Sequence, residues 1–273
     1  AFNKNKVLEL AENQSSLLSA AKFDQNYNSQ YSYIAKVGYP MGMMYGFIYE
    51  GTYKYEDFDK VGDTYTLKRN VPYFSSESNT QPGMPKYADL NGDGIIDDND
   101  RTMIGNGMPK HTGGFTNNFE YKGFDLSIFF QWSYGNDVLN ANRLFFENSN
   151  KTRDLNQYAS YADRWTPENP ESNIPRATDS GSNKVFSTRI IEDGSFLRLK
   201  TVSLGYTLPK QLTKKWKIDN ARVFVAGQNL WTCTGYSGYD PEVSIREGAL
   251  TPGLDFSAYP RAYSISFGIN LGF

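Results

Sequence analysis

The sequence has almost no cysteine or histidine and no long run of apolar residues. Disulfide frameworks, zinc centres and membrane-spanning helices depend on these features. It contains one cysteine, Cys233, and one histidine, His111, in 273 residues. One cysteine excludes an intrachain disulfide framework, and one histidine excludes a zinc site with several histidine ligands. No stretch approaches the roughly 20 apolar residues that a membrane-spanning helix needs. A β-barrel escapes that requirement, because only alternate residues of each strand meet lipid.

The chain also has no large excess of positive or negative charge. The chain carries 28 basic and 30 acidic residues, and no basic run is interleaved with aromatic side chains. This balance predicts no binding to nucleic acid. No Ser-His-Asp arrangement and no phosphate-binding loop occur, and nothing singles out a carboxylate pair for glycoside cleavage. We therefore expect a protein that is not an enzyme, and a secreted hydrolase is the weakest hypothesis.

Aromatic residues, by contrast, are abundant, and they alternate with small or polar residues at the end of the chain. The composition includes 20 Tyr and 18 Phe, although the mean hydropathy is −0.59. The apolar positions of the last segment are Tyr263, Ile265, Phe267, Ile269, Leu271 and Phe273. Period-two alternation gives a strand one apolar and one polar face. A terminal aromatic residue is typical of the closing strand of outer-membrane β-barrels, and a terminal strand of a soluble sandwich is the alternative.

Similar alternation elsewhere predicts an all-β fold with about seven antiparallel strands. Most of them have close to the ~9–11 residues that cross a bilayer at the tilt of a barrel strand. The predicted strands are Ala1–Val7, Met41–Tyr53, Gly113–Tyr121, Phe124–Tyr134, Phe196–Thr207, Ala221–Thr232 and Tyr263–Phe273.

The predicted connections are of two kinds. Lys122-Gly123 is a two-residue hairpin signal, and Pro209–Trp216 is a short basic connection with about one helical turn. The long connections are Lys54–Thr112, Gly135–Ser195 and Cys233–Ala262. Short periplasmic turns and long extracellular loops are the rule in outer-membrane barrels, so these three loops are predicted to be extracellular.

One connection does not fit this alternation of short periplasmic turns with long extracellular loops. Leu8–Pro40 should be periplasmic, yet it is long. Either it hides a strand around Tyr31–Val37, or the barrel has a long inner turn there. About seven strands cannot close a wide barrel, and an open edge is not tolerated in lipid. The N-terminus also lacks the pattern of a signal peptide. We therefore expect the chain to be part of a longer polypeptide or to pair with another chain.

An aspartate-rich segment has the ligand spacing of a calcium loop. The predicted ligands are Asp89, Asn91, Asp93, Ile95 through its backbone carbonyl, Asp97 and Asp100. Asp100 stands where such loops usually have the longer glutamate, which predicts weaker closure around the ion. The apolar Ile96 suits a loop that is anchored to a core. A metal-free turn rich in Asn and Asp is the alternative, because Asn-Gly and Asp-Gly are strong turn formers.

Other polar and aromatic residues are weaker candidates for contacts with a solute. Five polar residues lie within predicted strands, and we interpret them as ordinary filling of a polar lumen: Asp125, Gln131, Arg198, Lys200 and Gln228. Four aromatic residues lie in or beside the long loops, and we expect them to pack within the loops: Trp165, Trp231, Tyr236 and Tyr239.

A series of short motifs occurs in order along nearly the whole chain. In chain order they are Asp89–Gly105, Gly114–Phe119, Tyr121–Leu126, Arg164–Pro170, Phe196–Lys200, Leu204–Tyr206, Gly227–Leu230 and Tyr236–Glu242. Each motif is weak alone, but the ordered series resembles the C-terminal part of SusC/RagA-type TonB-dependent outer-membrane transporters. The resemblance implies that residues 1–273 form the C-terminal portion of a 22-stranded transmembrane barrel. The plug domain and the earlier strands lie outside this chain.

The resemblance also implies a function and a location. Such transporters are multi-pass barrels in the outer membrane of Gram-negative bacteria, where outer-membrane lipid surrounds them. They import oligosaccharides or oligopeptides with energy from the TonB system, which acts through the plug, and a SusD-like surface lipoprotein serves as a lid. In this topology a calcium ion would brace an extracellular loop. The alternative is a soluble secreted β-sandwich that binds glycans and carries a calcium loop.

Overall fold

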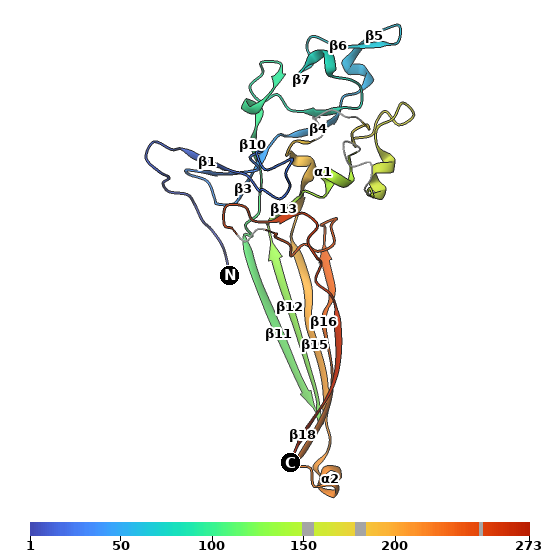
Figure 1. Ribbon diagram of the computed structural model, residues 1–273. Helices are drawn as coiled ribbons and strands as arrows, with labels where there is room; N and C mark the ends of the chain where they lie inside the picture. The colour runs from blue at the N-terminus through green and yellow to red at the C-terminus, as the bar shows by residue number, and fades with distance from the viewer. Residues whose placement is uncertain (149–155, 178–183, 246–247) are drawn as a thin grey trace.

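The longest strands form one five-stranded antiparallel sheet (Figure 1). The computed structural model describes residues 1–148, 156–177, 184–245 and 248–273. In spatial order the strands are β11 (His111–Tyr121), β12 (Phe124–Tyr134), β15 (Phe196–Thr207), β16 (Asn220–Thr234) and β18 (Ser264–Gly272). These are the last five predicted strands, with each end within two residues of its predicted position. Their alternation therefore located them correctly.

The register sorts side chains into one apolar and one polar face. One row across the sheet is apolar: Phe119, Leu126, Leu204, Val225 and Phe267. The neighbouring row points to the opposite face and is small or polar: Asn118, Ser127, Ser203, Ala226 and Ser266. Phe267 is 81 % exposed, so no second layer from the described residues covers the apolar face there. The soluble sandwich hypothesis is wrong for this sheet, because a sandwich buries its apolar face.

The strand lengths fit a bilayer. An 11-residue strand such as β12 spans about 36 Å along its axis. At a tilt of about 40° it crosses about 28 Å, close to the apolar thickness of a membrane. The connection between β11 and β12 is the predicted two-residue hairpin. Lys122 and Gly123 have positive φ angles of 47° and 88°, which is the backbone of a type I′ turn.

The two ends of the sheet differ (Figure 1). The turn end carries the β11–β12 hairpin, the C-terminus and the short helix α2 (Lys210–Thr213), which is followed by a 3-10 turn, η7 (Lys214–Trp216). The loop end carries the rest of the described chain, including the described parts of all three predicted extracellular loops. This arrangement agrees with the predicted separation of short turns from long loops.

The loop end holds small sheets and short helical turns. A four-stranded sheet contains β1 (Ser16–Ser19), β2 (Tyr33–Lys36), β3 (Met43–Gly46) and β10 (Thr102–Asn106). A three-stranded sheet contains β14 (Ile191–Asp193), β13 (Asp137–Asn140) and β17 (Leu254–Asp255). The strand pairs are β4 (Tyr49–Thr52) with β8 (Pro85–Tyr87), β5 (Phe58–Val61) with β6 (Thr64–Leu67), and β7 (Tyr73–Phe74) with β9 (Ile95–Ile96). The helical turns are α1 (Arg143–Phe146), η1 (Tyr55–Asp57), η2 (Glu77–Asn79), η3 (Asp98–Asp100), η4 (Ala159–Asp163) and η6 (Thr188–Ile190).

The main hydrophobic core lies at the loop end rather than beside the long sheet. Its buried residues come from widely separated parts of the chain: Ala21, Tyr27, Tyr33, Met44, Leu139, Ala141, Leu144, Phe186, Ile190 and Leu254. This core joins the separate loops into one packed body. Within the described residues, no helix is long and apolar enough to span a membrane.

The prediction of a barrel strand at Met41–Tyr53 is wrong. The segment divides into β3 and β4, which belong to two different sheets at the loop end. The first sheet is packed closely, since a Cβ atom on Gly46 would lie 2.3 Å from the carbonyl oxygen of Phe186. Met44 and Phe47 are both buried. The alternation in this segment therefore reflects packing among loops, not contact with lipid.

This correction resolves the position of Leu8–Pro40. The hidden strand exists as β2, but it belongs to the four-stranded sheet of the loop end, and the alternative of a long inner turn is wrong. Of the predicted strand Ala1–Val7, only the first residues pair with β11. Phe2 forms a bridge with His111, and the amide of Asn3 donates to the carbonyl of Lys110 at 2.8 Å. The chain therefore runs from the edge of β11 directly into the loops.

Candidate functional site at the loop end

A buried arginine fastens one long loop to the polar face of the sheet. Arg198 lies on β15, and its side chain is 2 % exposed. Its Nη2 donates to Oδ1 of Asp240 at 2.5 Å, and its Nη1 donates to Oε2 of Glu242 at 3.1 Å. Both acidic residues belong to the connection between β16 and β18. The ion pairs therefore hold that connection over the sheet.

The acidic partners are themselves well satisfied. Asp240 also accepts backbone N–H groups from Glu242 and Arg261, both at 2.9 Å. Burial acts to raise the pKa of Asp240, but the hydrogen bonds from Arg198 and from these amides outweigh it and lower the pKa. Glu242 pairs in addition with Arg261 at 2.9 Å and with Lys200 at 3.6 Å. The lowered pKa keeps the carboxylate of Asp240 charged, as a buried ion pair requires.

Glu242 of this network, together with its neighbours Pro241 and Val243, lines one side of a cavity of about 990 Å³. The other side is the polar face of β11 and β12, together with the loop that precedes β11. Its polar lining includes Thr112, Gln131, Ser133, Asn136 and Glu242. A cavity of this size, with apolar walls and a few polar groups, has the character of a ligand site.

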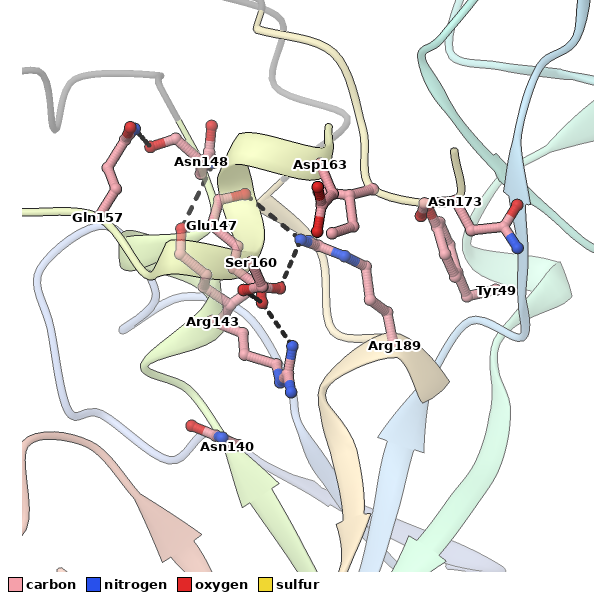
Figure 2. A network of polar contacts seen from close by, with 12 residues as sticks. Tyr49, Asn140, Arg143, Glu147, Asn148, Gln157, Ser160, Asp163, Asn173 and Arg189 are labelled. Carbon is pink, nitrogen blue, oxygen red and sulfur yellow. Dashed lines mark hydrogen bonds and ion pairs between the residues drawn. The ribbon is translucent and has the colours of Figure 1, made fainter. Parts of the chain in front are cut away.

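A second buried network joins four more elements of the loop end (Figure 2). Glu147 is 2 % exposed, and it accepts from Arg143 at 2.5 Å, from Arg189 at 2.9 Å and from Ser160 at 2.6 Å. Arg143 also donates to Glu192 at 2.7 Å. Burial alone would lower the pKa of Arg143 and raise that of Glu192, but their hydrogen bonds reverse both shifts. The network therefore fixes α1, η4 and η6 relative to β14.

Nearer the turn end of the polar face, a separate ion pair crosses the sheet. Arg222 on β16 donates to both carboxylate oxygens of Asp125 on β12, at 2.9 and 2.5 Å. The guanidinium passes over Gly205, where an added Cβ would lie 2.3 Å from Nη2. A larger side chain at this position of β15 would therefore have to displace the end of the Arg222 side chain.

The aspartate-rich loop is closed by hydrogen bonds from its own backbone. Asp89 accepts the amides of Gly92 and Gly94, at 2.7 and 2.8 Å. Asp100 is fully buried and accepts the amides of Leu90 and Asp97, both at 2.8 Å. Three predicted ligands lie on the exposed side of the loop and bond to it locally: Asn91, Asp93 and Asp97. Ile95 is 42 % exposed.

The loop is anchored as the sequence predicted. Ile96 is 1 % exposed and packs with Phe47 and Tyr87. Within the described residues, no group of three or more His, Cys, Asp or Glu side chains is arranged to hold a metal ion. Calcium binding by the six candidate ligands therefore stays a prediction.

Replacing Asp100 by alanine should open this loop. Asp100→Ala removes a buried carboxylate and leaves backbone amides unpaired, which should cost about 1–3 kcal/mol. Limited proteolysis of the intact protein measures this opening, because the protease should cleave the loop faster in the variant. Asp98→Ala is the matched control, because that side chain is 92 % exposed and makes one long ion pair. Equal cleavage of the two variants would contradict the role assigned to Asp100.

Of the four aromatic residues in or beside the long loops, two are buried and two are exposed. Trp165 is 4 % and Tyr236 is 6 % exposed, so both pack inside the loops as expected. Trp231 belongs to β16, on the apolar face in register with Leu199, and is 51 % exposed. Tyr239 is 85 % exposed and lines a smaller cavity of about 460 Å³ with Tyr158 and Tyr259.

The sequence did not reveal the two buried networks as units. It placed Arg198 and Lys200 on a polar face, but it did not pair them with Asp240 and Glu242. Acidic partners are required only because Arg198 is buried, and the sequence does not show that burial. Which acidic residues of the long loops would supply them depends on how those loops fold.

Comparisons with known proteins point to one family. No protein-family model matches the chain. The TonB-dependent receptor P3 of Formosa agariphila is 33 % identical over 278 residues, which covers 99 % of this chain and 26 % of the relative. The TonB-dependent receptor SusC of Bacteroides thetaiotaomicron is 28 % identical over 198 residues, covering 72 % of this chain and 18 % of SusC. A solved structure of the RagAB peptide transporter superposes with a TM-score of 0.73 at 24 % identity, covering all of this chain and 26 % of that chain.

The five-stranded sheet, with one apolar face, one polar face and long loops at one end, is part of the wall of a transmembrane β-barrel. The chain belongs to the TonB-dependent transporters of the SusC/RagA type, and it spans about a quarter of the length of these relatives. The resemblance found in the sequence is thereby confirmed.

Proposed function

We propose that the whole protein imports a nutrient across the outer membrane of a Gram-negative bacterium. The observation that carries this proposal is the strand-by-strand separation of an apolar outer face from a polar inner face. A polar lumen is suited to the passage of hydrated solutes, and the cavity at the loop end offers a place for their capture. The similar proteins are named as receptors and transporters, which agrees with a function that is not enzymatic.

The proposed substrates are oligosaccharides or oligopeptides, and the proposed energy source is the TonB system acting through a plug. A SusD-like surface lipoprotein is the proposed partner, because one relative is SusC and the structural neighbour is the RagAB peptide transporter. The loop end, stiffened by its buried ion pairs, is the surface against which a lid would close. The polar lining of the cavity and the exposed Tyr239 are compatible with either substrate class.

The test uses the full-length protein in cells from which its gene has been deleted. Expression of the full-length protein in these cells should restore uptake of a labelled oligosaccharide or oligopeptide. Collapse of the proton gradient should abolish that uptake. Uptake that persists without the gradient would indicate a passive pore. The partner is tested by co-purification of the lipoprotein with the detergent-extracted barrel, and a parent protein that is soluble without detergent would overturn the proposal.

We propose separately that the loop Asp89–Asp100 holds a calcium ion that braces it. A carboxylate has about four acceptor positions, so the amides bound by Asp89 and Asp93 leave capacity for a cation. Five acidic side chains in one short loop would also repel one another without a counterion. The proteolysis assay described for Asp100 tests this when it is run with calcium and with a chelator. We expect calcium to slow cleavage of the loop, and we expect Asp93→Ala to remove this protection. Equal cleavage with calcium and with the chelator would indicate a metal-free turn.

A further inference from the structure

The connection between β15 and β16 concentrates positive charge at the turn end of the sheet. It contains α2 and η7, and Figure 1 shows it beyond the end of the strands, at the same end as the C-terminus. Residues 209–219 include four lysines and one acidic residue, Asp219. The lysines are Lys210, Lys214, Lys215 and Lys217.

The fold of this turn leaves its side chains free. The backbone closes the turn, since the amide of Ile218 donates to the carbonyl of Thr213 at 3.2 Å. Thr213 is the anchor, with 1 % of its surface exposed. All four lysines are exposed, and none forms an ion pair with another described residue. Leu212 and Trp216 are also exposed, at 48 % and 65 %.

The turn lies next to the apolar face that identifies the sheet as a barrel wall. Phe124 and Tyr206 contact each other at this end of that face, with ring centroids 4.5 Å apart. Aromatic side chains of this kind mark the level of the lipid headgroups. Lys210 follows Tyr206 by four residues, a distance of at most about 13 Å along the chain. Lys210 therefore lies within reach of the headgroup layer, and the other three lysines belong to the same short turn. The alkyl stem of a lysine can lie along apolar surface while its charged end stays in water.

We propose that this turn binds the headgroups of anionic phospholipids in the leaflet around the turn end of the barrel. Trp216 and Leu212 enter the interface between headgroups and acyl chains, and the lysines bind the lipid phosphates. Exposed apolar residues beside lysines, in a turn that joins two strands of the barrel wall, favour a lipid over a soluble acidic partner. The inference rests on the proposed placement of the sheet in a membrane.

The experiment uses the full-length protein in detergent micelles at low ionic strength, where charge is least screened. Native mass spectrometry measures the preference for phosphatidylglycerol over phosphatidylcholine. Each lysine near a membrane surface is worth roughly fivefold in affinity, so Lys214→Gln with Lys215→Gln should lower the preference about 30-fold. The matched control is Lys4→Gln with Lys6→Gln, two exposed lysines at the loop end, which should leave the preference unchanged.

Three further results decide the inference. Trp216→Ala should weaken the retention of phosphatidylglycerol, because it removes the apolar anchor. An unchanged lipid preference in the double lysine variant would overturn the inference. Inorganic phosphate that competes with phosphatidylglycerol at equal concentration would also overturn it, because the site would then recognise a free anion. Failure of the intact protein to enter bilayers would instead overturn the membrane placement on which the proposed function depends.

Discussion

Replacing Arg198 by methionine should release the connection between β16 and β18. The substitution leaves Asp240 and Glu242 without their buried partner, and removal of one member of a buried ion pair typically costs about 3–5 kcal/mol. Asp240 is 4 % exposed and cannot regain solvent without movement of the loop. Hydrogen exchange of the full-length protein should show faster exchange of the amides of Glu242 and Arg261, which donate to Asp240.

Lys200→Met is the control for this experiment. Lys200 pairs with the same Glu242, but at 3.6 Å and with both side chains about a quarter exposed, at 25 % and 24 %. Such pairs contribute about 0–1 kcal/mol, so exchange should change little. Similar exchange in the two variants would mean that burial of Arg198 does not determine the stability of the loop. Reduced uptake by Arg198→Met, with the barrel still inserted, is the expected functional consequence.

An arginine at Ile128 should impair insertion of the barrel into a bilayer. Ile128 is next to the middle residue of β12 and lies on the apolar face, with aromatic residues towards both ends of the strand. An arginine on the lipid face near the bilayer midplane costs about 2–4 kcal/mol. The free energy of unfolding of the full-length protein in vesicles, from urea titration, should fall by this amount for Ile128→Arg.

Ser127→Arg provides the comparison, because Ser127 is the preceding residue on the polar face. Its cross-strand neighbours Asn118 and Ser203 are small or polar. A polar, water-filled lumen accepts the new charge, so a loss well below 2 kcal/mol is expected. Equal losses for the two variants would show that the two faces do not meet different solvents. The assignment of the sheet to a barrel wall would then fail.

The long strands were predictable because one physical constraint governs each of them. A strand with lipid on one side and water on the other must alternate, and these strands extend over nine to 15 residues, with register shifts only in the pairings of β15. The hairpin at Lys122-Gly123 was predictable for a local reason, since glycine adopts positive φ at little cost. The ordered motifs also identified the family, although each was weak alone.

The same alternation misled at Met41–Tyr53. The pattern there arises from burial among loops, and sequence periodicity does not reveal which environment covers each face. Gly46 was informative only afterwards, because its close approach to the backbone of Phe186 joins residues far apart in the chain. The aspartate-rich loop shows the same limit. Its spacing suits both a calcium site and an Asx-rich turn, and the sequence alone does not choose between them.

The sequence by itself determined the strands, their two faces, the hairpin and the family, because these depend on local periodicity and on residues close together in the chain. Only the tertiary structure decided that the strands between residues 16 and 106 form small sheets at the loop end, and that Arg198 meets Asp240 while Glu147 meets Arg143 and Arg189. The physical reason is that charged side chains select partners through space. Burial makes those partners obligatory, but only the fold of the loops determines which acidic and basic residues meet.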